Sequence, residues 1–182
     1  PALSSAASDV YKRQAISHLD EQVGRVIKHM ENENMLENTY IVFTSDHGLS
    51  VGQHGLIGKQ SLYDHSIRVP MIITGPGITK NKIIKEDIYL QDVMPTILDL
   101  ADIKVPSSVD FKSLKTMLFE KKNEKLYDAI YGTFGCCSTE NYIDFQRMIR
   151  KDDFKLMLFP INKRLELYDL KNDPYEINDL AI

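Results

Sequence analysis

A carboxylate and an imidazole lie side by side directly after a short apolar run. The run Tyr40-Ile41-Val42-Phe43 is rich in β-branched and aromatic residues, which predicts a strand buried on both faces of a parallel sheet. Asp46 and His47 follow the carboxyl end of this strand. Ligands of open α/β sheets bind beyond the carboxyl ends of the strands, so this position indicates a site for a metal ion or an anion.

The residues that follow add glycines and two more polar side chains. Glycines occupy positions 48, 52, 55 and 58, where they allow tight turns and a close approach of the backbone to a ligand. His54 and Lys59 belong to the same stretch. One carboxylate, two imidazoles and one ammonium within sixteen residues predict a site for a metal ion together with an oxyanion. For His54 two roles stay open, a contact with the substrate or a hydrogen bond that orders the loop.

Helices and strands alternate around this loop. Apolar residues at positions 16, 19, 23, 26, 27 and 30 predict a helix over Ile16–Met30 with one apolar face. Val69–Thr74 predicts a second buried strand. Asp92 precedes a helical pattern with Pro95 in its first turn, and capping explains Asp92 better than metal binding does. Helix, strand, loop and strand in this order predict an α/β fold.

Beyond Leu126 the pattern changes to short strands. Four runs fit strands, at 128–131, 145–150, 154–159 and 164–168, and the last three are separated by hairpin turns. We therefore expect part of a mixed, largely parallel sheet flanked by helices, followed by a small antiparallel C-terminal sheet.

These changes divide the chain into three segments. Residues 1–14 resemble a translated adapter and are expected to be a non-native leader. Residues 15–125 are expected to form the α/β part, and residues 126–182 the small antiparallel subdomain.

Composition narrows the possible partners. Hydrophobic residues make up 43% of the chain, as in an ordinary globular protein, and 22 basic against 26 acidic residues leave a net charge of -4. This balance argues against a nucleic-acid or anionic-membrane partner, which needs a concentrated basic face. No apolar run approaches the roughly 20 residues that span a bilayer. Cys136 and Cys137 are adjacent, so free thiols are expected.

The stretch from Thr44 to Lys59 closely resembles the second half of the catalytic domain of the sulfatase family, in the alkaline phosphatase superfamily. The resemblance continues through Gln60–Tyr63 and Ile67–Pro70, resumes at Asp92–Leu98, and returns at Leu167–Glu176, which reads Leu-Tyr-Asp-Leu-Lys-Asn-Asp-Pro-Tyr-Glu. It implies an enzyme that hydrolyses sulfate esters of carbohydrates, or aryl or alkyl sulfates, with one divalent metal ion.

The resemblance also implies roles for individual residues. In that family the position of Asp46 gives a carboxylate to an active-site calcium ion, the position of His47 lies beside the ion, and the position of Lys59 binds the sulfate group. Asp46 and His47 are therefore the expected metal-site residues, His47 and Lys59 the catalytic residues, and Lys59 and His54 the substrate-binding residues. A periplasmic or secreted location is expected from the family, with any export signal upstream.

The nucleophile of the family is expected outside this sequence. Sulfatases convert the cysteine or serine of a Cys/Ser-x-Pro/Ala-x-Arg motif to formylglycine, and neither Cys136 nor Cys137 is followed by an arginine at the required place. We therefore expect the chain to be a fragment that holds metal weakly and is inactive by itself.

Two alternatives stay open. Imidazole suits zinc or manganese better than calcium, so His47 is compatible with a phosphodiesterase or phosphonate hydrolase of the same superfamily. The spacing of Lys59 from Asp46 and the C-terminal motif favour the sulfatase. A non-catalytic domain that binds sulfated glycans is the third reading, and the intact Asp46 and Lys59 make it the least favoured.

Overall fold

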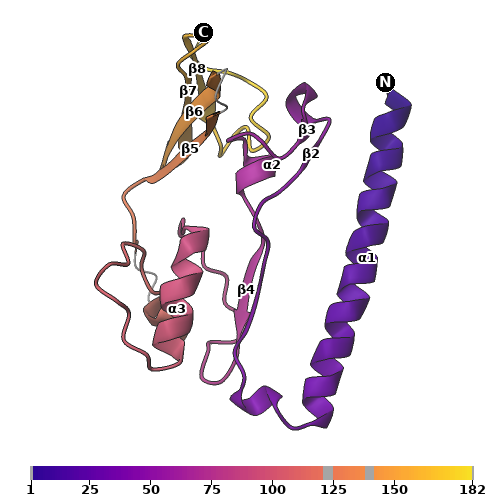
Figure 1. Ribbon diagram of the computed structural model, residues 1–182, viewed down its shortest axis with the longest axis vertical. Coiled ribbons are helices and arrows are strands. Elements are labelled where there is room, and N and C mark those ends of the chain that lie inside the picture. The colour runs from indigo at the N-terminus through magenta and orange to yellow at the C-terminus, as the bar shows by residue number, and fades with distance from the viewer. Residues whose placement is uncertain (1, 121–124, 138–141, 182) are drawn as a thin grey trace.

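The computed structural model describes residues 2–120, 125–137 and 142–181. A long helix runs along one side of the molecule, a strand pair and short helices occupy the middle, and a four-stranded sheet lies near the C-terminus (Figure 1). The predicted α/β class with a small antiparallel C-terminal sheet is confirmed. No helix in the described part of the chain is long and apolar enough to cross a membrane.

The first helix, α1 (Ala2–Asn32), contains the predicted helix and extends it toward the N-terminus. The segment set aside as a leader is therefore helical from Ala2 onward, while its non-native origin stays a prediction. The predicted apolar face is not buried against the described residues, because Ile16, Leu19 and Val26 are each more than half exposed. A 3-10 turn, η1 (Leu36–Asn38), leads from α1 into the first strand.

Two strands form the central pair, β1 (Ile41–Thr44) and β4 (Met71–Thr74). They pair antiparallel, with Ile41 opposite Thr74 and Thr44 opposite Met71. Both strands were predicted, but the expectation that they lie in parallel and buried on both faces was wrong for this pair, since β1 is half-buried and β4 alternates between half-buried and exposed residues. A continuous apolar run indicates burial but carries no information about the direction of the neighbouring strand.

The glycine-rich stretch between these strands forms a small hairpin. Its strands are β2 (Ser50–Val51) and β3 (Ile57–Gly58), which pair antiparallel around the 3-10 turn η2 (Gln53–Gly55). A single helical turn, α2 (Asp64–Ile67), follows and leads back to β4. The hairpin brings the end of this stretch, at Lys59, back to its beginning at His47.

The short helices of the middle region are η3 (Leu90–Asp92), α3 (Val93–Leu100) and α4 (Lys115–Phe119). The Asp92 carboxylate is fully buried and accepts the backbone N–H of Tyr89 at 2.8 Å, the backbone N–H of Lys112 at 3.0 Å and the Tyr127 hydroxyl at 2.5 Å. Asp92 directly precedes α3, but the prediction that it caps this helix was wrong, because its side chain makes no capping hydrogen bond to α3. The carboxylate belongs instead to the capping box of η3, where it accepts the N–H of Tyr89. Its oxygens are occupied by donors, which leaves no room for a metal-binding role.

The C-terminal sheet is an antiparallel meander of four strands, β5 (Ile130–Cys137), β6 (Tyr142–Lys151), β7 (Phe154–Phe159) and β8 (Arg164–Asp169). The first strand is longer than predicted. One face of the sheet packs on the segment before α2, and the shared core holds Leu62, Tyr63, Met148, Met157, Phe159 and Tyr168. The free-thiol prediction for Cys136 and Cys137 concerns side chains outside the described part of the structure.

Candidate active site

Asp46, His47 and Lys59 come together beyond the carboxyl end of β1. Lys59 Nζ lies 2.7 Å from His47 Nε2, and His47 Nε2 lies 3.4 Å from Asp46 Oδ2. The β2–β3 hairpin turns the chain back, so Lys59 meets a residue twelve positions earlier. Three of the four polar residues predicted for one site are neighbours.

The partners of His47 assign its tautomer. A lysine ammonium has only donors, so Lys59 donates to Nε2. The other ring nitrogen, Nδ1, then carries the proton and donates it to the Gly48 carbonyl oxygen at 2.9 Å. Nε2 then has no proton to give to Asp46 Oδ2, 3.4 Å away, so these two atoms are neighbours and not a donor–acceptor pair.

Asp46 keeps an ionised carboxylate open to solvent. Desolvation works to raise the pKa of this carboxyl group, but the backbone N–H of His47, 2.9 Å from Oδ1, and positive charge on the neighbouring side chains outweigh it and lower the pKa below its ordinary value. The side chain is 82% exposed. An exposed, ionised carboxylate is available as an oxygen ligand for a divalent cation.

Gly48 determines where the Asp46–His47 pair sits. Its N–H donates to the Ser66 carbonyl oxygen at 2.7 Å. A Cβ atom at position 48 would lie only 2.0 Å from the His65 carbonyl oxygen. Only glycine therefore allows the loop to pack this closely against α2.

The three residues line an open cleft of about 940 Å³. Other lining side chains come from the segments on both sides of α3 and from β5, among them Tyr89, Gln91, Phe111, Tyr127, Asp128 and Tyr131. Thr133 and Phe134, both in β5, also line the cleft.

The structure does not bring His54 into this cleft. The His54 ring stacks on Tyr63 with 3.9 Å between centroids, and its Nε2 lies 3.2 Å from the carbonyl oxygen of Tyr175. His54 therefore links the hairpin to the C-terminal tail. Its predicted contact with a substrate stays a prediction.

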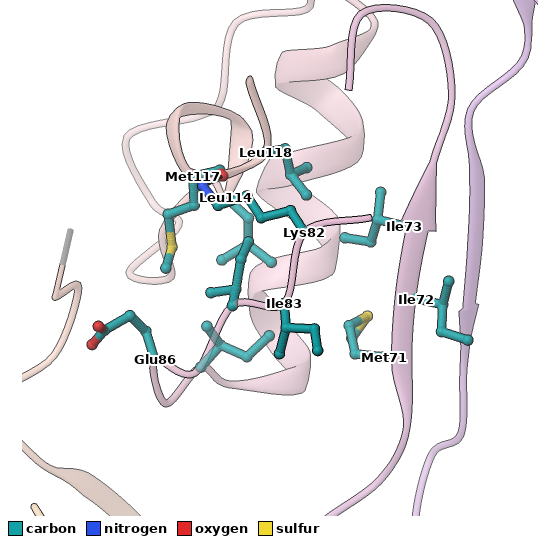
Figure 2. Close-up of a pocket in the computed structure, with 11 residues that line it drawn as sticks. Met71, Ile72, Ile73, Lys82, Ile83, Glu86, Leu114, Met117 and Leu118 are labelled. Carbon is teal, nitrogen blue, oxygen red and sulfur yellow. Dashed lines mark hydrogen bonds between the residues drawn. The ribbon is translucent and has the colours of Figure 1, made fainter. Parts of the chain in front are cut away.

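A smaller cavity away from this cleft holds none of the predicted site residues. It has a volume of about 370 Å³ and is lined mainly by apolar side chains of β4, the 82–88 segment and α4 (Figure 2). Lys82 faces it, but Nζ donates to the carbonyl oxygens of Met117 at 2.9 Å and Glu120 at 2.7 Å. This cavity lacks a free charge for an anionic group, so the cleft is the better candidate site.

The aromatic walls of the cleft had no signal in the sequence. Tyr89 packs edge-to-face on Tyr127 at 4.8 Å and on Phe111 at 5.6 Å between ring centroids. These residues belong to three separate segments that meet only on folding. No local motif marks them, which is why the sequence did not reveal the walls of the cleft.

The family model described as N-sulphoglucosamine sulphohydrolase, C-terminal, matches residues 52–181. The chain belongs to the sulfatase family. The match covers Lys59 of this sulfatase chain and the whole C-terminal sheet with the tail that follows it.

Bacterial sulfatases are among its relatives. An arylsulfatase of Clostridium perfringens is 35% identical over 170 residues, which are 91% of this chain and 34% of that protein. An N-acetylglucosamine-6-O-sulfatase of Bacteroides thetaiotaomicron is 35% identical over 167 residues, which are 89% of this chain and 30% of that protein. The sulfatase chain thus spans about a third of the length of these relatives.

Solved structures share the backbone of this sulfatase chain. A protein in complex with its substrate D-glucosamine-2-N,6-O-disulfate has a TM-score of 0.82 and 33% identity, covering 91% of this chain and 34% of that one. A phosphonate monoester hydrolase of Agrobacterium radiobacter has a TM-score of 0.80 and 27% identity, covering 91% and 35%. The same fold therefore occurs in a protein with a sulfated substrate and in a hydrolase of phosphonate monoesters.

Proposed function

We propose that this chain forms one side of a sulfatase active site that hydrolyses sulfate esters. The proposal is carried by the cluster of Asp46, His47 and Lys59 on the wall of an open cleft, in a chain of the sulfatase family. A sulfate ester bears dense negative charge, and more charge develops on the leaving oxygen as its bond to sulfur breaks. Preorganised positive groups stabilise that charge.

Each residue of the cluster has a proposed task. The Lys59 ammonium holds the sulfate oxygens as a point charge, a task that suits lysine although it lacks the fork of arginine. Asp46 gives a carboxylate oxygen to a divalent cation. Once sulfate binds the Lys59 ammonium, the unprotonated Nε2 of His47 is released and can accept a hydrogen bond from a hydroxyl of the nucleophile; it can donate to the sulfate group only after taking up a proton.

Calcium is the proposed cation. The exposed, ionised carboxylate of Asp46 suits a cation that prefers oxygen ligands, and the bound ion would supply positive charge beside the sulfate group. Within the described residues, no three His, Cys, Asp or Glu side chains are grouped closely enough to hold a metal ion. We therefore propose that the remaining ligands and a formylglycine nucleophile come from sequence outside this chain, and that the chain alone is inactive.

The proposed substrate is a sulfated sugar. Aromatic side chains and the polar Gln91 and Asp128 line the same cleft as Lys59. Rings of this kind stack on the apolar faces of sugars, while amide and carboxylate groups bind sugar hydroxyls. The names of the N-acetylglucosamine-6-O-sulfatase and of the substrate D-glucosamine-2-N,6-O-disulfate support an amino sugar, while the name of the Clostridium perfringens arylsulfatase keeps an aryl sulfate as the alternative substrate.

A zinc or manganese phosphonate hydrolase is the second candidate. It is favoured by the imidazole of His47 next to Asp46 and by the structural likeness to the Agrobacterium radiobacter enzyme. A non-catalytic domain that binds sulfated glycans ranks third.

The test uses the complete reading frame that encodes this chain, expressed with a formylglycine-generating enzyme. Release of sulfate and of phosphonate or phosphate is measured from aryl esters and from glucosamine sulfates, with added calcium, zinc or manganese. We expect calcium-dependent sulfate release, and a loss of roughly 100-fold or more in Lys59→Ala. Lys80→Ala is the matched control, because Lys80 is an exposed lysine that does not line the cleft.

The other outcomes separate the candidates. Phosphonate or phosphate release that needs zinc or manganese would support the second candidate. Binding of sulfated glycans without any hydrolysis would support the third.

A further inference from the structure

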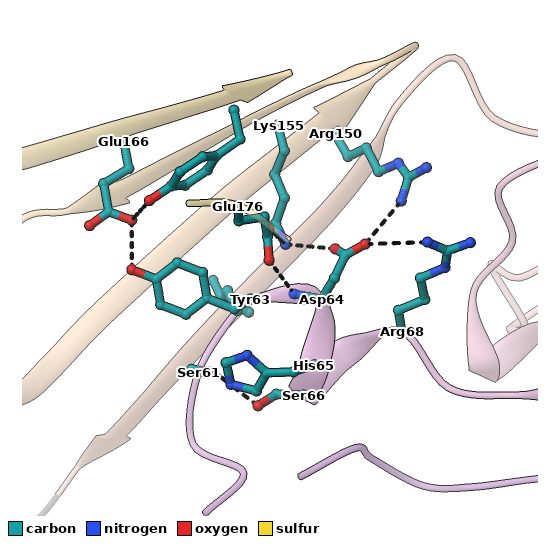
Figure 3. Close-up of polar contacts among 12 residues, drawn as sticks. Ser61, Tyr63, Asp64, His65, Ser66, Arg68, Arg150, Lys155, Glu166 and Glu176 are labelled. Atoms are coloured by element: carbon teal, nitrogen blue, oxygen red, sulfur yellow. Dashed lines mark hydrogen bonds and ion pairs between the residues drawn. The ribbon is translucent and has the colours of Figure 1, made fainter. Parts of the chain in front are cut away.

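The tail that follows β8 contains a buried carboxylate, that of Glu176. Glu176 is 2% exposed, and its Oε1 lies 2.6 Å from Lys155 Nζ. Its Oε2 accepts the backbone N–H of Asp64, the first residue of α2, at 2.7 Å (Figure 3). One side chain of the tail thus joins the C-terminal sheet to α2.

Lys155 holds the same helical turn by its side chain. Its ammonium is fully buried on β7 and lies 2.8 Å from Asp64 Oδ1. The other oxygen of Asp64 faces Arg150 at 3.7 Å and Arg68 at 3.9 Å, as Figure 3 shows. The start of α2 is therefore anchored by both its backbone and its side chain.

From α2 the contacts continue to the cleft. The Ser66 carbonyl oxygen accepts the N–H of Gly48 at 2.7 Å, and the Gly48 carbonyl oxygen accepts Nδ1–H of His47 at 2.9 Å. Gly48 cannot shift toward α2 because its backbone is already packed against the His65 carbonyl. The position of α2 therefore sets the position of His47 and of its neighbour Asp46.

The backbone of Glu176 adds a second observation. Its φ is +58°, in the left-handed region that non-glycine residues rarely adopt. In this conformation the carboxylate lies between the Lys155 ammonium and the N–H of Asp64. Unfavourable backbone conformations of this kind persist where surrounding contacts hold them, and they gather near functional sites.

We propose that Glu176 is a positioning residue for the sulfatase reaction. By accepting the N–H of Asp64, it holds α2 so that Ser66 fixes Gly48, and with it the orientation of His47 in the cleft. This inference rests on the proposed function. Because misplacement of a reacting group by about 1 Å can lower a rate by roughly 100-fold, loss of the contact is expected in kcat rather than KM.

The test compares two double variants of the complete protein, Lys155→Met/Glu176→Gln and Lys155→Met/Glu176→Ala. Both lack the buried charges of Lys155 and Glu176, so they are matched in electrostatics. Only glutamine keeps an oxygen that can accept the N–H of Asp64. We expect kcat of the alanine variant to fall about tenfold below that of the glutamine variant, with KM changed by less than roughly twofold. Equal kcat values would overturn the proposal.

Met157→Ala is the stability control. Met157 is fully buried on β7 and packs in the core, without a polar contact to α2. We expect a lower thermal midpoint with kcat unchanged. A loss of kcat as large as that of the alanine double variant would mean that any loss of stability slows the reaction, and would overturn the positioning role.

Hydrogen exchange at the Gly48 amide gives a readout that needs no enzyme activity. The amide should exchange faster in the alanine double variant and remain protected in the glutamine variant. If the wild-type protein hydrolyses no sulfate ester, the proposed function fails, while this measurement still decides whether Glu176 positions Gly48. Unchanged exchange, or faster exchange with no loss of kcat in an active enzyme, would overturn the proposal.

Discussion

Two groups of charged residues in this chain differ in what surrounds them. In the cleft cluster of Asp46, His47 and Lys59, the Asp46 side chain is 82% exposed and its oxygens face the open cleft. In the buried cluster of Asp64, Lys155 and Glu176, Lys155 and Glu176 are at most 2% exposed and every member is paired. The first group has capacity left for a ligand, and the second has none.

This difference separates two uses of charge. A buried ion pair contributes little net stability compared with apolar residues, yet removal of one partner is costly because the other charge is left unpaired. An exposed charge costs little to remove, since water replaces its partners. The cleft cluster should therefore be sensitive in activity, and the buried cluster sensitive in stability and, through Glu176, in positioning.

The largest expected effect on stability is that of Lys155→Met. It leaves the carboxylates of Glu176 and Asp64 beside an apolar side chain, so the free energy of unfolding should fall by about 3–5 kcal/mol. Lys59→Ala is the control and should change it by less than about 0.5 kcal/mol. Urea unfolding followed by circular dichroism measures both. Equal losses of unfolding free energy in the two variants would show that the buried cluster is no more sensitive in stability than the cleft cluster.

Gly48→Ala tests the packing of the Asp46–His47 loop on α2, which links the cleft cluster to the buried cluster. The added methyl group would lie 2.0 Å from the His65 carbonyl oxygen, so the loop must move away from α2. We expect a loss of about 1–3 kcal/mol in the free energy of unfolding, by analogy with overpacking, together with a fall in kcat. A variant with wild-type stability and kcat would show that the cleft cluster does not depend on α2.

His54→Ala tests whether His54 has a structural role or contacts the substrate. Loss of the stacking on Tyr63 and of the contact with Tyr175 should lower the free energy of unfolding by about 1 kcal/mol, with KM unchanged. Thermal unfolding and steady-state kinetics give the two values. A raised KM without a loss of stability would instead support the predicted substrate contact.

The smallest effect is expected at Asp169, where an exposed charge has only local partners. The Asn172 side-chain amide, together with backbone N–H groups, lowers the pKa of Asp169 below its ordinary value. A lowered pKa contributes stability above the unfolded pKa of about 4, and this contribution is lost as the pH falls through the folded pKa. Asp169→Asn should therefore be slightly less stable than wild type at pH 7 and equally stable near pH 2. Thermal midpoints at both pH values test this, and a difference that grew toward low pH would contradict it.

Local features of the site were predictable from the sequence. Asp46 and His47 directly follow a strand, and the hairpin that returns Lys59 is encoded by glycines within the same stretch. The direction of the β1–β4 pair was not predictable, because an apolar run is the same for either direction. The contact of His54 with Tyr175 was not predictable, because Tyr175 lies 121 positions away in the sequence.

The buried cluster was the hardest part to foresee. Glu176 meets Asp64 across 112 positions, and Lys155 meets Asp64 across 91. In the sequence, these residues look like ordinary surface charges. Only the folded arrangement shows which charges are enclosed.

The left-handed backbone of Glu176 has a consequence for how this sequence should diverge. That conformation costs a non-glycine residue about 1–2 kcal/mol, and an apolar replacement of a buried ion pair is often neutral or stabilising. Descendants selected only for folding should therefore drift toward an apolar residue at position 155 and glycine at position 176. Descendants selected for turnover should retain glutamate at position 176. The two lineages would then differ at a residue that is distant in the sequence from Asp46, His47 and Lys59.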